Sequence, residues 1–268
     1  MTKTKLSMLA IVLVLLVGGT TTLLMRNRDP VYMPPANPDP QAILNEAQAD
    51  TAAGRYRDAL AKHIWYRDNA LKYQPAQRGV RNSFALMYWG QLGEKYPPAL
   101  KKLKAIRSDA IKRLQKHDSD NDAITTAFIT AISINNALNE KGKNVELFKE
   151  LDANHPAAAK NAYPVAENDL IQAKEYAICG RYMDPDRTYT RITRLYNLNK
   201  DSTSAQLQDF AVKSFSNETA RLVAVLAINN RNDDAQRISD QASKELTTPE
   251  FAALLASARN GTVPPQWP

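Results

Sequence analysis

The chain has 268 residues, of which 44% are hydrophobic and 24% are charged. This composition is ordinary for globular proteins and excludes a wholly disordered chain. The single cysteine, Cys179, excludes an intramolecular disulfide framework. Because the sequence has only three histidines besides, it has little material for a zinc site, and we expect neither a metal nor a cofactor.

The formal net charge of +7 is concentrated in one region. Residues 55–116 contain 15 Lys and Arg against 4 Asp and Glu, so this stretch carries +11 and the rest of the chain carries −4. A regional excess of this kind favours acidic partners or anionic surfaces. No recognised nucleic-acid-binding motif accompanies it, so we expect no nucleic-acid partner.

The N-terminal residues predict a membrane anchor. Residues 1–5 form a short tail with two lysines, and residues 6–25 are uncharged and mostly apolar. Twenty helical residues reach about 30 Å, which matches the hydrocarbon thickness of a bilayer. We therefore expect a single transmembrane helix that acts as a signal anchor, with a cleaved signal peptide and a buried soluble helix as the alternatives. The flanking charges favour a cytoplasmic N-terminus and a periplasmic C-terminal domain at a bacterial inner membrane.

The rest of the chain reads as a linker, a helical domain and a tail. Residues 26–40 are rich in proline and predict a stiff, extended linker. Over residues 41–260 apolar side chains recur with helical spacing, which predicts an all-α domain. Residues 261–268 are predicted to form a flexible tail. The expected helices are 41–53, 57–73, 79–95, 98–116, 121–139, 144–153, 157–173, 175–182, 186–197, 203–229, 233–246 and 249–259.

The segment that begins at Gly54 carries the clearest repeat signal. Gly54 permits the reversal at a helix end, Tyr56 fills the space between two helices, and Ala59 lets them approach closely. With Ala47 before it and Pro75 after it, this unit resembles a tetratricopeptide repeat (TPR). Weaker copies follow at four places, which are Leu92, Gly142, Lys174 and Asn230.

The resemblance implies an α-solenoid of TPR-like helical hairpins. Stacked helix pairs of this family expose a surface that binds a peptide or protein segment. Three further stretches, at residues 65–71, 79–86 and 96–101, resemble uncharacterised bacterial membrane-anchored TPR-like proteins. That resemblance brings no activity with it. An irregular helical array without a binding role is the alternative.

Two sets of residues are candidates for partner binding. Aromatic side chains interleave with the basic region and could line a partner groove, with packing between helices as the alternative for most of them. Lysines on the polar side of the helix predicted over 98–116 could contact an acidic partner or anionic lipid, or could simply face water. The candidate residues are Tyr56, Trp65, Tyr66, Tyr88, Trp89, Lys101, Lys104 and Lys112.

No motif of a known catalytic class is present. We expect Cys179 to be a packed small residue, and Asp120 or Asp122 to cap a helix rather than to bind calcium. The sequence therefore predicts a membrane-anchored helical-repeat module or scaffold that binds a protein or peptide, and not an enzyme. A cell-envelope enzyme or enzyme subunit without a recognisable motif and an oligomeric structural scaffold are the alternatives. The oligomeric state is left open.

Overall fold

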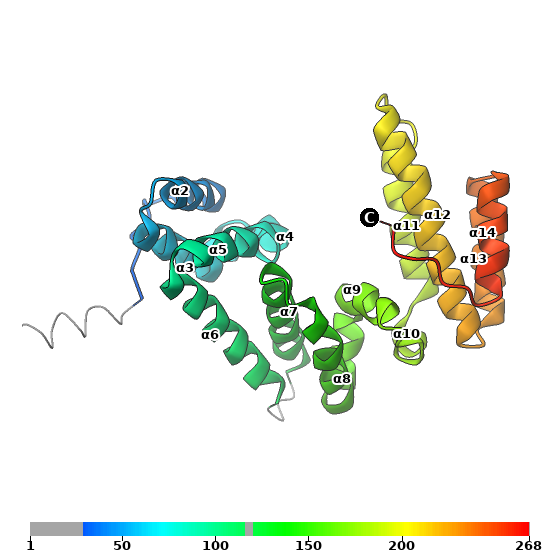
Figure 1. The fold of residues 1–268 in the computed structure, drawn as a ribbon, viewed down its shortest axis with the longest axis horizontal. Helices are drawn as coiled ribbons and strands as arrows, with labels where there is room; N and C mark the ends of the chain where they lie inside the picture. The colour runs from blue at the N-terminus through cyan, green and yellow to red at the C-terminus, as the bar shows by residue number, and fades with distance from the viewer. Residues whose placement is uncertain (1–28, 116–119, 268) are drawn as a thin grey trace, which may run out of the picture. The chain divides into compact units, whose positions relative to one another are not determined.

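The structure is a computed structural model that describes residues 29–115 and 120–267. Over these residues the chain forms 13 α-helices and two short 3-10 turns, with no β-strand (Figure 1). The all-α prediction is confirmed for this part of the chain. The predicted tail over 1–5 and the predicted transmembrane helix over 6–25 lie outside the described residues. Of the helices that are described, none is both long enough and apolar enough to span a bilayer.

The described residues fall into two compact units. Unit 1 comprises the residues up to Ser108 together with Asn136–Leu138, and unit 2 comprises Asp109–Asn135 and the residues from Asn139 onward. The range 41–260, which the sequence predicts as one helical domain, thus contains two units. Helix α6 (Pro97–Leu114) contributes its first residues to unit 1 and its last residues to unit 2.

The helices follow the predicted ranges closely. Before α6 come α2 (Pro40–Ala52), α3 (Tyr56–Tyr73), α4 (Arg78–Arg81) and α5 (Phe84–Lys95). After α6 come α7 (Asn121–Ala137), α8 (Asn144–Asn154), α9 (Pro156–Gln172), α10 (Tyr176–Tyr182), α11 (Pro185–Asn199), α12 (Ala205–Ile228), α13 (Asn232–Glu245) and α14 (Pro249–Arg259).

The helix predicted over 79–95 is interrupted. The backbone leaves the helical conformation at Ser83, where φ is −130° and ψ is −94°. The Ser83 hydroxyl donates to the carbonyl oxygen of Gly79 at 2.8 Å. Serine side chains compete in this way for backbone hydrogen-bonding groups, which weakens a helix interior. The segment therefore divides into α4 and α5.

Prolines and capping side chains fix several helix starts. Helices α2, α9, α11 and α14 begin with proline, which lacks the N–H that a first helical residue leaves unpaired. The side chains of Asp39, Asp184 and Thr248 accept hydrogen bonds from first-turn N–H groups of α2, α11 and α14. Asp120 accepts two such bonds from α7, which confirms the cap predicted there.

Three helical hairpins share one turn geometry. Gly54, Lys174 and Asn230 have φ values of 77°, 60° and 59° and connect α2 to α3, α9 to α10 and α12 to α13. In each turn the N–H of the following residue donates to the carbonyl oxygen five positions earlier, which pairs groups that the helix end would leave free. Five positions after each turn residue, a small side chain is buried: Ala59, Cys179 and Ala235.

The weak copy expected at Gly142 differs. Gly142 lies in the 3-10 turn Lys141–Lys143 and has no positive φ, whereas Asn139 has a φ of 57°. The N–H of Glu140 donates to the carbonyl oxygen of Asn135 at 2.7 Å. The left-handed turn residue is therefore Asn139. Asparagine tolerates this conformation better than most other residues.

Each unit has its own apolar core. In unit 1, α3 packs against α2 and α5 around Ile43, Leu44 and two large rings. In unit 2, α12 is the central helix and contacts α10, α11, α13 and α14. Its residues Arg221–Leu226 are all buried. Burial of a large apolar side chain contributes about 1.5–3 kcal/mol to the stability of the fold. This gain does not apply to the charged guanidinium of Arg221, the first residue of the run, so its burial requires a separate explanation.

Candidate functional site

Three of the predicted partner-binding aromatic residues are core residues. Trp65, Tyr66 and Trp89 are only 9%, 1% and 1% exposed. The indole N–H of Trp89 donates to the carbonyl oxygen of Ala99 at 3.1 Å, and the Tyr66 hydroxyl donates to the Gln77 side chain at 2.8 Å. Packing accounts for these three rings, and as buried side chains they offer no surface to a partner.

The two other predicted rings are half-buried and have different surroundings. Tyr56 stacks on Tyr96, with ring centroids 6.1 Å apart. Tyr88 packs against the unit 1 core and also lines a groove of about 690 Å³ between α2 and α5. Tyr88 is the only aromatic residue in the lining, which is otherwise small or polar: Gln48, Ala49, Thr51, Ala52, Gln91, Glu94 and Lys95.

The predicted lysines are exposed on α6. Spacings of three and eight residues place Lys101, Lys104 and Lys112 on one face of the helix. Lys112 lies 3.7 Å from the exposed carboxylate of Asp109. Lys101 and Lys104 form no ion pair with the residues that the structure describes. Their charges are therefore accessible from solvent.

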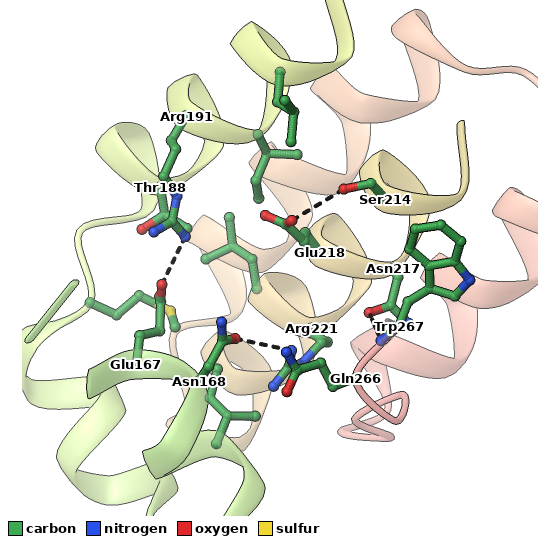
Figure 2. A pocket seen from close by; sticks show the side chains of 15 residues that line it. Glu167, Asn168, Thr188, Arg191, Ser214, Asn217, Glu218, Arg221, Gln266 and Trp267 are labelled. Atoms are coloured by element: carbon green, nitrogen blue, oxygen red, sulfur yellow. Dashed lines mark hydrogen bonds and ion pairs between the residues drawn. The ribbon is translucent and has the colours of Figure 1, made fainter. Parts of the chain in front are cut away.

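A second cavity lies within unit 2 and was not predicted. It has a volume of about 410 Å³. It is lined by α9, α11, α12 and the C-terminal segment, which comprises residues 261–267 (Figure 2). Four ionisable side chains line it: Glu167, Arg191, Glu218 and Arg221. Its apolar lining includes Ile171, Ile192 and Leu222. The cavity therefore combines fixed charges of both signs with apolar walls.

The charged side chains of this cavity differ in the hydrogen-bond partners that they have. Arg191 donates to Glu167 at 2.8 Å, and the Ser214 hydroxyl donates to Glu218 at 3.2 Å. Arg221 is only 5% exposed, and its Nη1 donates to the Asn168 side chain at 3.1 Å. The Nε of Arg221 has no hydrogen-bond partner. Burial lowers the pKa of Arg221 below its ordinary value, because desolvation disfavours the cation.

The C-terminal segment forms one wall of the cavity (Figure 2). The Asn217 side chain donates to the carbonyl oxygen of Pro265 at 2.9 Å and accepts from the N–H of Trp267 at 3.3 Å. The Trp267 ring lies 5.3 Å from that of Phe210, centroid to centroid. The segment that we expected to be a flexible tail is therefore attached to α12 as far as Trp267.

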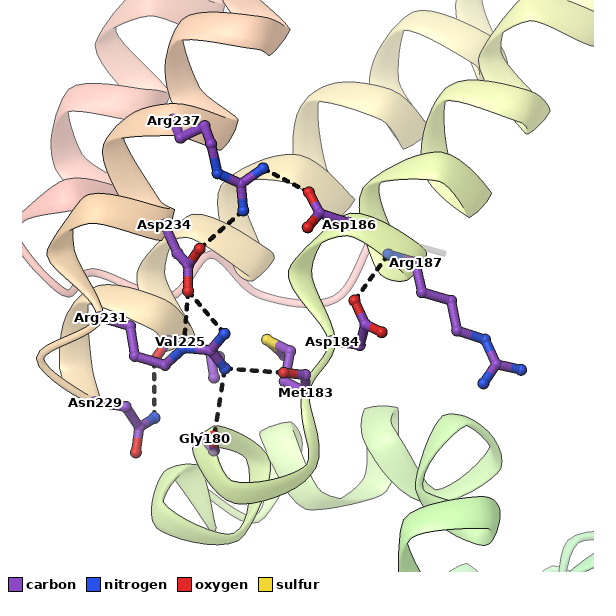
Figure 3. A network of polar contacts seen from close by, with 10 residues as sticks. All are labelled: Gly180, Met183, Asp184, Asp186, Arg187, Val225, Asn229, Arg231, Asp234 and Arg237. Atoms are coloured by element: carbon purple, nitrogen blue, oxygen red, sulfur yellow. Dashed lines mark hydrogen bonds and ion pairs between the residues drawn. The ribbon is translucent and has the colours of Figure 1, made fainter.

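A polar network joins the turn before α13 to the end of α10 (Figure 3). The Arg231 guanidinium donates to the carbonyl oxygens of Met183, at 2.8 Å, and Gly180, at 3.4 Å. It also pairs with Asp234 at 2.7 Å, and Asp234 in turn pairs with Arg237. These contacts with Arg237 and Arg231 lower the pKa of Asp234. The network positions α10 and α13 against each other.

Gly180 is part of the same arrangement. A Cβ added there would lie 2.2 Å from the Asn229 side chain. That side chain donates to the carbonyl oxygens of Tyr176 and Val225 at 2.9 and 2.8 Å. Only glycine permits this close approach at the end of the α12 helix.

Cys179 and His63 are both buried. Burial raises the pKa of the Cys179 thiol to about 11, which suits the packed residue expected from the sequence. Burial lowers the pKa of His63 to about 4. No cluster of three potential metal ligands occurs within 29–115 and 120–267.

Sequence reasoning missed the cavity because its parts are distant in the chain. The one local signal was Arg221, a charged residue directly before the apolar run Leu222–Leu226. No family model, curated protein or solved structure matches this chain. Comparison with known proteins therefore does not indicate what the cavity binds.

Proposed function

We propose that this chain is a membrane-anchored binding module whose TPR-like hairpins hold a protein or peptide segment. In this proposal residues 6–25 anchor the chain, residues 41–260 form a solenoid, and the helical part faces the periplasm. The shared geometry of the hairpin turns at Gly54, Lys174 and Asn230 supports the repeat relationship.

The observation that carries the proposal is the groove between α2 and α5. Both helices belong to unit 1, and stacked helical hairpins expose an extended surface that takes a ligand segment. Ala49 and Ala52 are exposed and small, so a bound chain can approach α2 closely. Tyr88 supplies an amphipathic ring of the type that anchors partners.

The groove also favours binding over catalysis. Its lining holds one carboxylate, one ammonium group, two amides, the hydroxyls of Thr51 and Tyr88 and two alanines, but no histidine, cysteine or serine. Such a set can hold a peptide backbone through amide hydrogen bonds, whereas it offers no activated nucleophile.

Photo-crosslinking tests the groove directly. A photoreactive residue in place of Gln91, in the full chain expressed in cells, should give a discrete adduct with one partner. The added substitution Ala49→Arg fills the groove and should abolish that adduct. The matched control is Ala105→Arg, which places the same side chain on an exposed position of α6. An adduct that survives Ala49→Arg as well as it survives the control contradicts the proposal.

The exposed lysines of α6 support a second contact with an acidic partner. Replacement of Lys101, Lys104 and Lys112 by Glu should weaken binding of a polyglutamate peptide at low salt, where charges are least screened. The wild-type affinity should fall as salt is raised. Equal affinity of the variant and the wild-type chain at low salt contradicts this contact.

A topology experiment tests the anchor. The C-terminus is fused in turn to a reporter that is active only outside the cytoplasm and to one that fluoresces only inside it. An outside signal with retained membrane association is expected. An inside signal reverses the proposed orientation.

A further inference from the structure

The cavity in unit 2 contains a buried cation that forms no contact ion pair among the described residues. Among the described residues the Arg221 guanidinium has one hydrogen-bond partner, the neutral Asn168 side chain, and its buried Nε has none (Figure 2). It forms no ion pair with the residues that the structure describes. Because an unpaired buried charge costs several kcal/mol, buried arginines normally contact a carboxylate. A ligand oxygen anion in the cavity would give the guanidinium a direct ion pair.

Neither carboxylate of the cavity forms a direct ion pair with Arg221, although both favour its charged form from a greater distance. Glu167 is held by Arg191 at 2.8 Å. Glu218 lies one helical turn before Arg221 on α12, a spacing at which Glu and Arg commonly pair, yet it accepts instead from Ser214. Glu218 also forms no ion pair among the described residues. The cavity thus holds one cation and one anion on the same helix that are both available to a ligand.

The charge balance of the cavity selects the class of ligand. Arg191 and Glu167 neutralise each other, and Arg221 and Glu218 carry opposite unit charges. A simple anion gains from Arg221 but is repelled by Glu218, and a simple cation meets the reverse. A molecule with both charges meets an opposite charge at each end. The apolar walls formed by Ile171, Ile192 and Leu222 suit an aliphatic side chain.

We propose that this cavity binds a zwitterion, namely a free amino acid or a short peptide with an apolar side chain. Its carboxylate lies at the Arg221 guanidinium, and its ammonium group lies at the Glu218 carboxylate. The amide side chains of Asn168 and Gln266 also line the cavity. The volume of about 410 Å³ accommodates a dipeptide. This inference does not depend on the groove between α2 and α5.

Calorimetry with defined probes tests the proposal on the unmodified full chain in a mild detergent. The probes are L-leucine and L-leucyl-L-leucine, each with an N-acetylated and a C-terminally amidated analogue. At least one free zwitterion should bind saturably with one site per chain. Blocking either end should weaken its binding at least tenfold, since each block removes one charged contact.

The analogues separate the two halves of the proposal. An acetylated probe that binds as tightly as the free one overturns the role of Glu218, and an amidated probe that does so overturns the role of Arg221. If none of the probes binds, the zwitterion site is overturned as a whole. These outcomes leave the crosslinking result at Gln91 unaffected, so the two proposals fail independently.

Variants then assign the contacts. Glu218→Gln should remove the preference for a free amine but keep the preference for a free carboxylate. Arg221→Met should remove the preference for a free carboxylate, provided that circular dichroism shows an intact fold. The matched controls are Glu250→Gln and Arg194→Met, both on exposed residues outside the cavity lining. Identical probe preferences in Glu218→Gln and Glu250→Gln contradict the assignment.

Discussion

His63 stacks on Trp89 in the core of unit 1, with ring centroids 5.5 Å apart and 25° between the ring planes. Neither ring nitrogen of His63 has a hydrogen-bond partner. Burial lowers the pKa of His63 from 6.5 to about 4, because the imidazolium would place a charge among apolar groups. The core therefore accepts only the neutral ring.

This arrangement predicts a loss of stability in mild acid. Between pH 6.5 and pH 4 the unfolded chain binds a proton at His63 that the folded chain does not bind. The free energy of unfolding therefore falls as the pH falls through this window, by about 3 kcal/mol at pH 4, and is unaffected above it. Urea unfolding followed by tryptophan fluorescence at a series of pH values measures this loss.

The variant His63→Phe is the matched comparison. It keeps an aromatic ring against Trp89 and removes the titrating group. The pH dependence of its unfolding free energy should be shallower than that of the wild-type chain between pH 6.5 and pH 4. Parallel curves for the two proteins mean that His63 does not carry the effect.

The turn after α9 predicts a stabilising substitution. Lys174 has a φ of 60°, a conformation that is strained for a residue with a Cβ. Lys174→Gly should therefore raise the free energy of unfolding by about 0.5–1 kcal/mol. Lys160→Gly, at an exposed position inside α9, is the control and should lower it by about 1 kcal/mol. Chemical denaturation distinguishes the two signs, and a destabilised Lys174→Gly chain contradicts the argument.

The Arg231 network predicts unequal effects for two arginines. Arg231→Met leaves the carbonyl oxygens of Met183 and Gly180 without their donor, which should cost about 1–3 kcal/mol. Arg237→Met removes only more exposed ion pairs with Asp234 and Asp186 and should cost about 0–1 kcal/mol. Thermal unfolding of both variants measures the difference. Equal losses contradict a special role for the Arg231 guanidinium.

Local signals in the sequence predicted the helices well, because proline starts, capping side chains and apolar spacing act within a few residues. The turn at Asn230 was predicted in the same way, since its left-handed backbone depends on its own side chain and neighbours. Ser83 was missed because its hydroxyl bond to Gly79 competes with an otherwise favourable helical pattern.

The candidate sites were harder to predict because burial depends on residues far apart in the chain. Tryptophan is common in binding surfaces, but Trp65 and Trp89 pack in the core. The pairing of Glu167 with Arg191 joins two helices across 24 positions, and Arg221 meets Asn168 across 53. Apolar periodicity places such residues on a helix face but does not say which helix covers that face.

Asn217 holds the C-terminal wall of the cavity against α12. The Asn217 side chain both donates to Pro265 and accepts from Trp267, so one residue holds the segment at two points. Asn217→Ala should detach the segment, and amide hydrogen exchange over residues 262–267 should become at least several-fold faster. Asn197→Ala, on an exposed position of α11, is the control and should leave this exchange unchanged. Because Trp267 lines the cavity, the Asn217→Ala chain should also bind the zwitterionic probes more weakly. Unchanged exchange in Asn217→Ala means that other contacts, such as the Phe210–Trp267 ring pair, suffice to hold the wall in place.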